Sequence, residues 1–340
     1  RLRAKAESLG RVTIRASQKG KREVEVDGLY SELLEEGGIS IKDAFKVKMI
    51  VRNPDRDYHD INDETSINRS VTTSDGLRAA PFFFRSDGSA VDIVSLYRDQ
   101  HAFLIMNGGS VNQHDLEILQ SPGVMTMGVN NGSHIIRTNL WACVDEPYRF
   151  MPSVWMDPRI MKFVPHAHFH KRIIDLDQGK PTGVPVASCP NVLGYRRNER
   201  FNHEEFLTES TINWGNHGSL GGGRSVMLAS LRILHLLGFR TVYLLGCDFH
   251  MSQDNKYFFA ENRDARAIQN NSRSYELMTG YFRKIRPVFD KAGFEVYNLN
   301  PESSLRVFPF MPFEQAVVRA TRTILPELQR DTVGMYVKRT

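Results

Sequence analysis

The sequence predicts an α/β fold built on a doubly wound, mostly parallel sheet, and three observations point to it. The chain has 340 residues, 41% of them hydrophobic and 24% charged, which is the composition of a globular protein. From His101 onwards, short apolar runs end in Gly or polar residues, as buried parallel strands do. Segments with apolar residues at helical spacing lie between several of these runs, so strands and helices alternate.

Six apolar runs are predicted to be strands, and three amphipathic segments are predicted to be helices. The strands cover residues 102–106, 124–129, 140–144, 184–189, 241–245 and 294–299. The helices cover residues 224–237, 274–291 and 314–327, and Gly238 and Gly293 end the first two. This order predicts a Rossmann-like, nucleotide-binding domain over residues 96–330.

The first ninety residues differ from the rest of the chain. Residues 1–22 are rich in Lys and Arg with hardly any apolar periodicity, residues 30–36 are helical in pattern, and residues 53–75 are polar and turn-rich. We therefore expect residues 1–95 to form an irregular N-terminal extension or a small appended layer. A solvated extension is favoured over a basic arm for nucleic acid. Residues 331–340 are expected to be a polar tail.

Charge and cysteine content narrow the class of protein. The formal net charge of +5 accommodates a nucleotide, a nucleic acid or an anionic glycan without requiring one. Cys143, Cys189 and Cys247 are widely spaced, so we expect buried thiols in a reducing compartment and no zinc or disulfide framework. No apolar run approaches 18 residues, and no signal peptide is recognisable. We expect a cytoplasmic protein (host cytoplasm if viral) without a membrane span. Its oligomeric state stays open.

The predicted nucleotide site follows from the carboxyl ends of the strands, where doubly wound sheets bind ligands. Glycines after the first strand let backbone N–H groups approach a phosphate, although a plain tight turn explains them as well. No GxGxxG or GxxxxGK[ST] motif occurs, which disfavours ordinary dinucleotide and P-loop binding. The strand ends place Asn107, Gly108, Gly109, Ser110, Asn130 and Asp145 around one crevice.

A second glycine-rich loop, residues 216–225, comes directly before a predicted helix. Gly222, Gly223, Arg224 and Ser225 at a helix start can hold a phosphate, because backbone, helix dipole and guanidinium act together. The alternative is a flexible loop. Another cluster, His166, His168 and His170, would share one face of a strand, but a polar face or loop is favoured over a metal site.

Several motifs in one order resemble a known group of enzymes. They are Asn107 to Ser110 (NGGS), Asn130 after a second strand, the Gly/Ser loop, and Leu237 to Phe249 (LGFRTVYLLGCDF). Over about residues 100–310 the chain resembles the bacterial lipooligosaccharide sialyltransferases. It is also similar to the related 6-hydroxymethylpterin diphosphokinase-like (MptE-like) clan, which is widespread in bacteria and phages. The Gly-Cys-Asp-Phe block is specific for the clan and not for one activity.

The resemblance implies roles for individual residues. It implies nucleotide contacts at the first loop and Asn130, a position near the donor for Asp145, and phosphate contacts near Arg224 and Ser225. His250 stands where the family has a tyrosine beside the leaving phosphate, and Tyr257 matches a second such tyrosine. The family's general base, a His before a Ser, corresponds to Asn271, so a transferase would need another base.

A base is needed because an attacking hydroxyl must lose its proton, and a positioned side chain contributes about 10²–10⁴-fold. The candidates are His250, Asp248 and His217, with His250 preferred because it directly follows the last strand before the crevice. The alternative is that Asp248 orders a loop and His250 is a surface residue. Asp248 could also hold Mg²⁺ on a diphosphate.

These observations predict a nucleotide-sugar-dependent glycosyltransferase that uses a CMP-, UDP- or GDP-linked donor. Its hydroxyl acceptor would belong to a glycan or to a hydroxylated base in phage DNA. One alternative is a Mg²⁺-dependent ATP diphosphotransferase of the MptE-like type. The other is a non-catalytic protein that binds a nucleotide or nucleic acid. Fold-level analogy does not decide between them.

Overall fold

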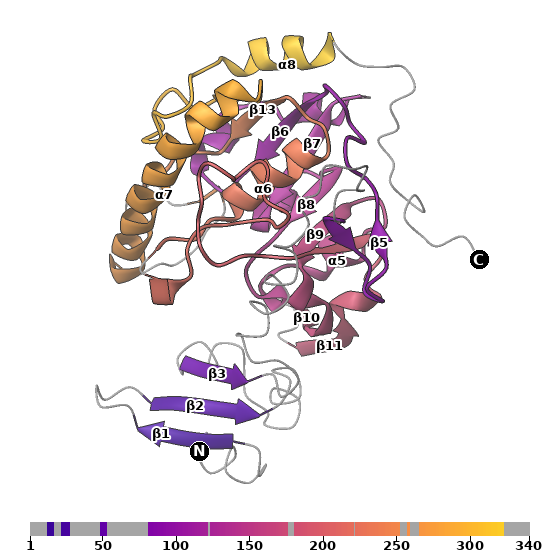
Figure 1. The fold of residues 1–340 in the computed structure, drawn as a ribbon, viewed down its shortest axis with the longest axis vertical. Helices are drawn as coiled ribbons and strands as arrows, with labels where there is room; N and C mark the ends of the chain where they lie inside the picture. Colours follow the sequence, from indigo (N-terminus) through magenta and orange to yellow (C-terminus); the bar gives the residue numbers. More distant parts are fainter. Residues whose placement is uncertain are drawn as a thin grey trace, which may run out of the picture.

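The structure is a computed structural model, and it describes three N-terminal strands and most of residues 81–322 (Figure 1). Residues 122, 176–179, 221, 252–256 and 259–264 lie outside the described part. The predicted helical stretch 30–36, the turn-rich segment 53–75, the end of the last predicted helix and the tail 331–340 also lie outside it.

The N-terminal region contains a small sheet. Strand β1 (Val12–Ala16) pairs antiparallel with β2 (Arg22–Asp27), which pairs parallel with β3 (Lys48–Arg52). Residues 1–95 were expected to form an irregular extension or a small appended layer, and these three segments form a sheet. Apolar residues at alternate positions, as in Val24 and Val26, are typical of a strand, and this period of two was overlooked in a basic region.

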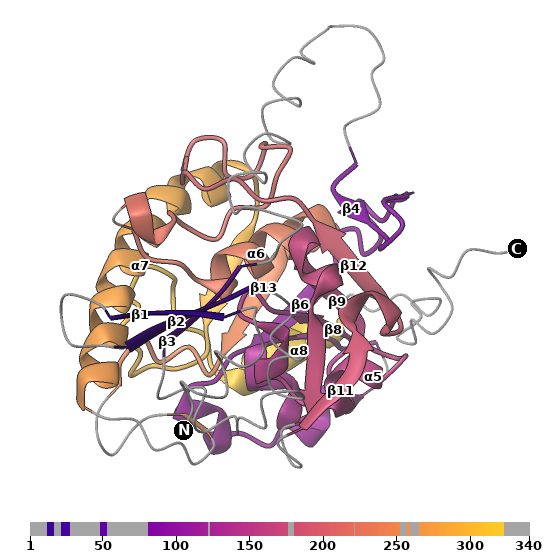
Figure 2. The same cartoon turned by 90° about the horizontal axis from the view of Figure 1, so that it is seen from below.

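The main unit is a nine-stranded sheet in the order β14-β13-β6-β7-β8-β9-β12-β4-β5. The strands from β14 to β12 run parallel, while β4 and β5 are antiparallel to their neighbours. Figure 2 shows β13, β6, β8, β9 and β12 in this order. The bounds are β4 (Phe83–Phe84), β5 (Ala90–Val91), β6 (His101–Ile105), β7 (Met125–Val129), β8 (Leu140–Ala142), β9 (Met161–Pro165), β12 (Val192–Tyr195), β13 (Thr241–Leu245) and β14 (Glu295–Asn298). The predicted α/β fold with a doubly wound, mostly parallel sheet is confirmed.

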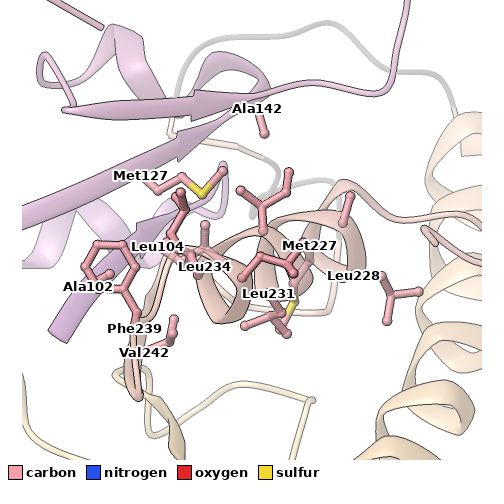
Figure 3. Close-up of a cluster of buried hydrophobic side chains, with 14 of the residues drawn as sticks. Ala102, Leu104, Met127, Ala142, Met227, Leu228, Leu231, Leu234, Phe239 and Val242 are labelled. Carbon is pink, nitrogen blue, oxygen red and sulfur yellow. The ribbon is translucent and has the colours of Figure 1, made fainter. Parts of the chain in front are cut away.

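Both faces of this sheet are covered, as alternate side chains of β6 show. Ala102 and Leu104 belong to the core beneath α6 (Val226–Leu236) and α7 (Ala265–Lys291). Phe103 and Ile105 belong to a second core on the opposite face, beneath α8 (Phe313–Thr321). Figure 3 shows Leu231 and Leu234 of α6 beside Leu104. The apolar run of β6 is continuous because its residues meet one core or the other.

Shorter elements complete the described part. Helix α5 (Pro152–Met156) and the antiparallel pair β10 (Arg172–Asp175) and β11 (Lys180–Pro185) lie beyond β8 in the chain. The 3₁₀ helices are η2 (Gly109–Gln113), η3 (Glu117–Gln120), η4 (Asn130–His134), η5 (Pro147–Arg149), η6 (His166–His170), η7 (Val186–Ser188) and η8 (Gly218–Leu220). No helix of the described residues is long and apolar enough to cross a membrane.

Most predicted elements are found, and three expectations are corrected. The predicted strand 184–189 is wrong, because β11 ends at Pro185, which lacks a backbone donor, and η7 follows. The three histidines near residue 168 lie on η6 and not on a strand, so the spacing by two no longer puts them on one face. The central sheet also includes β4 and β5, which precede the boundary placed at residue 96.

Lys162 explains why β9 was missed in the sequence. Its side chain is completely buried, and its ammonium donates hydrogen bonds to the carbonyl oxygens of Asp157, Ile160 and Pro190 at 2.7, 2.9 and 2.8 Å. A charged residue in the middle of an apolar run breaks the pattern of a buried strand. Here the charge is tolerated because all three ammonium hydrogens have acceptors.

We predict that Lys162→Met lowers the free energy of unfolding by about 3 kcal/mol, because it removes the only donor of these three hydrogen bonds while keeping most of the side-chain volume. Urea denaturation measures this loss. The control is Lys284→Met on the exposed side of α7, which should change stability by less than about 0.5 kcal/mol. A Lys162→Met variant as stable as the wild type would show that the buried ammonium gives no net stabilisation.

Candidate functional site

The switch point of the sheet lies between β6 and β13. From β6 the chain continues to β7 on one side, whereas from β13 it continues to β14 on the other. The two loops that leave these strands therefore diverge at the carboxyl edge of the sheet. In open α/β sheets this is where ligands bind, which makes the loops after β6 and β13 the candidate site.

The two loops are joined directly by backbone hydrogen bonds. Met106 N donates to Leu245 O at 2.8 Å, and Gly108 N donates to Gly246 O at 2.9 Å. A Cβ on Gly108 would lie 2.5 Å from Gly246 O and 2.6 Å from Asp248 Cγ. Gly108 is therefore required for the close approach of the two loops, whatever ligand contacts its backbone makes.

The buried carboxylate of Asp248 connects the loops that follow β6, β13 and β14. Its side chain is 4% exposed, and its carboxylate accepts hydrogen bonds from Ser110 N at 3.1 Å, from Ser110 Oγ, and from Asn300 Nδ2 at 2.9 Å. These donors come from the loops after β6 and β14, so one carboxylate joins the ends of three strands. This geometry supports the interpretation of Asp248 as a loop-ordering residue. Asn300 was missed in the sequence, although its place just after a strand was a usable signal.

The same geometry gives a poor fit for Mg²⁺ at Asp248. Both carboxylate oxygens already accept hydrogen bonds, and no cluster of three or more His, Cys, Asp or Glu side chains is found within the described ranges. Magnesium needs free oxygen ligands in octahedral geometry. The neighbouring Cys247 is no nucleophile either, because burial, followed by the charge of Asp248, raises the pKa of its thiol well above the usual range.

His250 is oriented by the backbone of Asp248. The imidazole Nδ1 lies 3.1 Å from Asp248 O, and the ring is half-buried. Because a carbonyl oxygen can only accept, Nδ1 carries the proton in this contact and Nε2 is the basic nitrogen. Phe249 between them has φ of 55°, a left-handed conformation that is unusual for a bulky residue. The strained turn places His250 beside Asp248 O.

The strand-like pair Tyr257 and Phe258 runs along the first loop. Tyr257 forms an antiparallel bridge with Gly108, and Phe258 N donates to Asn107 O at 3.0 Å. Tyr257 was predicted to lie near the nucleotide, and the structure brings it to the loop of residues 107–110 from a segment 150 residues further along the chain.

Asn107 and Asn130 follow the neighbouring strands β6 and β7. The Oδ1 atom of each is buried and has no hydrogen-bond partner among the described residues. A buried acceptor without a donor is costly, by about 1–3 kcal/mol. Asn130 has φ of 51°, and its carbonyl accepts a hydrogen bond from Trp141 Nε1 at 2.7 Å. Both unsatisfied oxygens lie just beyond the carboxyl ends of neighbouring strands of the sheet.

Asp145 follows β8, the next strand of the sheet, and is half-buried. It forms an ion pair with Arg149 at 3.5 Å, while the adjacent Glu146 binds Lys171 at 2.8 Å. Asp145 thus lies at the carboxyl edge of the sheet, as expected, and one strand further from the switch point than Asn130.

The second glycine-rich loop packs against α7. A Cβ on Gly222 would lie 2.5 Å from Tyr281 Oη, and one on Gly223 would lie 2.6 Å from Met278 Cε. Ser225 caps α6, since its Oγ accepts from Met227 N at 3.1 Å. The glycines and Ser225 therefore have packing and capping roles, and the exposed Arg224 remains available for an anion.

Asn271 and His217, the two candidates for the family's base position, lie in different parts of the structure. Asn271 Nδ2 contacts Met251 Sδ at 3.3 Å, which brings Asn271 beside the turn that carries His250. His217 lies in the glycine-rich loop, and its backbone N donates to Glu199 O at 3.2 Å. The structure thus brings Asn271 to the turn that holds His250. It ties His217 to the segment after β12.

No model of a protein family matches the sequence, and no curated protein matches it either. The resemblance to the sialyltransferases and the MptE-like clan therefore rests on the sequence motifs alone. What those families do is carried into the proposal below, where the geometry of this chain has to support it.

We predict that Asp248→Asn destabilises the fold by about 2–3 kcal/mol. The substitution replaces one accepting oxygen by an NH2 group, which then faces a donor of Ser110 or Asn300. Ser110→Ala should cost about 1 kcal/mol. Because the two residues share bonds, the double variant should lose clearly less than the sum of the single losses. Chemical denaturation measures all three, with the exposed Asp92→Asn as the control. Additive losses would contradict this account.

Proposed function

We propose that the chain is a nucleotide-dependent transferase that moves a sugar from a nucleotide sugar to a hydroxyl acceptor, with His250 as the general base. The observation that carries the proposal is the hydrogen bond between His250 Nδ1 and Asp248 O. It leaves Nε2 as the basic nitrogen, immediately after the strand that forms the switch point. A base must be held in position and in one tautomer, and this contact does both.

Asp248 also connects the proposed base to the proposed nucleotide loop, residues 107–110. Its carboxylate fixes Ser110 of the loop after β6, while its carbonyl fixes His250. The nucleotide would lie over residues 107–110 and 130, close to the buried and unsatisfied amide oxygens of Asn107 and Asn130. Tyr257 and Arg224 are proposed to lie near the departing phosphate.

The proposed reaction is a single displacement. The acceptor oxygen attacks the anomeric carbon, the bond from that carbon to the phosphate oxygen breaks, and the nucleotide leaves with the bonding electrons. The hydroxyl proton passes to Nε2 of His250. No metal is used in this scheme, which agrees with the poor fit of Asp248 for Mg²⁺. Diphosphate transfer from ATP would need the ion and is therefore the second choice.

Nucleotide binding is the first test. We predict that a CMP-, UDP- or GDP-containing ligand raises the melting temperature without Mg²⁺, since a ligand at 100 times its Kd adds about 2.7 kcal/mol. The panel is CMP, UDP, GDP, ADP and ATP, each with and without Mg²⁺, followed by thermal unfolding. An ATP response that requires Mg²⁺ would favour the diphosphotransferase. No response to any nucleotide would contradict the proposal.

The role of the base is tested by His250→Gln. The substrate is a sugar nucleotide that contains the nucleotide found to raise the melting temperature. We predict a fall in kcat of about 10²–10⁴-fold with nucleotide affinity unchanged, because only proton transfer is removed. Release of free nucleotide in the presence of acceptor measures the rate. His170→Gln, an exposed histidine on η6, is the control and should keep full activity. A variant at position 250 with normal kcat would assign the base elsewhere.

A further inference from the structure

A groove lies between the turn that carries His250 and the helix α7. It encloses a cavity of about 400 Å³, a size typical of small-molecule sites. One wall is the turn from Phe249 to Met251 together with Ser304, and the other wall is α7. Apart from His250, the residues of this cavity belong to none of the candidate site residues described above.

The α7 wall is a polar stripe. Ser272, Glu276, Thr279 and Arg283 all line the cavity, and their spacing of four, three and four residues puts them on one face of the helix. Eleven residues of helix span about 16 Å. The site is therefore an elongated groove and not a compact pocket.

Contacts across the groove fix the order of its parts. Met251 meets α7 at Asn271, near one end of the stripe. The ring of Phe249 lies 5.0 Å from that of Tyr275 and 5.8 Å from that of Phe282. His250, between Phe249 and Met251, is thus near the Ser272 end.

The other end of the groove meets the loop after β14, where Arg286 Nη1 donates to Val307 O at 3.0 Å. Arg283 lies one helical turn before Arg286. It therefore marks the end of the groove opposite to Asn271.

The charges of the groove limit what can bind there. Glu276 and Arg283 are exposed, and neither side chain forms a hydrogen bond or ion pair with another residue of the described part. Arg283 is the one permanently charged cation of the lining, and Glu276 offsets it. A nucleic-acid strand needs several cations along its backbone, so this groove does not suit one. A guanidinium does suit a single carboxylate or phosphate, and a carboxylate accepts hydrogen bonds from hydroxyl groups.

We propose that this groove holds the acceptor of the transfer reaction, and that the acceptor carries one carboxylate or phosphate group. Arg283 binds the anionic group, Glu276 and the hydroxyl residues bind neighbouring hydroxyl groups, and the reacting hydroxyl faces Nε2 of His250. That the bound molecule is an acceptor rests on the proposed function. The binding site itself is a separate claim about the groove.

The test measures binding of matched pairs to the full chain by saturation-transfer NMR. The pairs are glucuronate with glucose, lactobionate with lactose, and glycerol 3-phosphate with glycerol. A ten-nucleotide single strand of DNA is the fourth probe. The variant is Arg283→Gln, and the control is Arg273→Gln, an exposed arginine of α7 outside the groove lining. Carboxylate and phosphate probes together show which anion is preferred.

We predict that the anionic member of at least one pair binds about five-fold more tightly than its neutral partner, since one exposed charged hydrogen bond is worth about 1 kcal/mol. Arg283→Gln should abolish this preference, while Arg273→Gln should keep it. Equal binding within every pair, no binding of any anion, or DNA binding that depends on Arg283 would each overturn the proposal.

Nucleotide binding separates the two proposals. The nucleotide-induced shift in melting temperature should be the same in wild type and Arg283→Gln, which also shows that the variant is folded. If the anionic sugars bind but no nucleotide does, the groove is a binding site and the transferase proposal fails. If nucleotides bind and the anions do not, the groove proposal alone fails.

Discussion

The buried carboxylate of Asp248 is the interaction on which the candidate site depends. The loops after β6, β13 and β14 leave the sheet in different directions, and the strand order alone does not fix how they meet. Three hydrogen bonds from Ser110 and Asn300 fix it. Taking a carboxylate out of water is costly unless its oxygens are satisfied, so the pairing and the burial require each other. The carboxylate thereby fixes Ser110, while the carbonyl oxygen of the same residue contacts His250.

The arrangement separates two kinds of surface on either side of Asp248. Its side chain is directed to the loop after β6, and the buried amide oxygens of Asn107 and Asn130 lie without hydrogen-bond partners in the described part just beyond β6 and β7. Its carbonyl faces His250 and the groove along α7. A transferase needs a donor side and an acceptor side around one base. Rigid strand ends supply such a framework better than mobile loops do, because misplacement by about 1 Å costs about 10²-fold in rate.

The sequence predicted an element correctly where burial or helix capping alone determines the local pattern. Strands β6, β7 and β13 are continuous apolar runs because two cores cover them, and α6 has both a clear helical period and the cap Ser225. It was misleading where tertiary contacts override the local pattern. Buried Lys162 hid β9, and the polar first turns of α7 hid the start of that helix at Ala265. The place of Asn300 after a strand was a usable signal, but its pairing with Asp248 cannot be derived from spacing, since the two residues meet only after the strands are paired.

The glycine-rich segments show why a sequence alone could not separate ligand contacts from packing. A glycine is needed wherever something approaches the backbone closely, and the approaching group can be a phosphate or a neighbouring helix. Gly222 and Gly223 meet Tyr281 and Met278 of α7, and Gly108 meets the loop of Gly246, so packing accounts for all three. What packing leaves unexplained are the buried amide oxygens of Asn107 and Asn130. Unsatisfied acceptors at adjacent strand ends therefore point to a ligand more directly than the glycines beside them do.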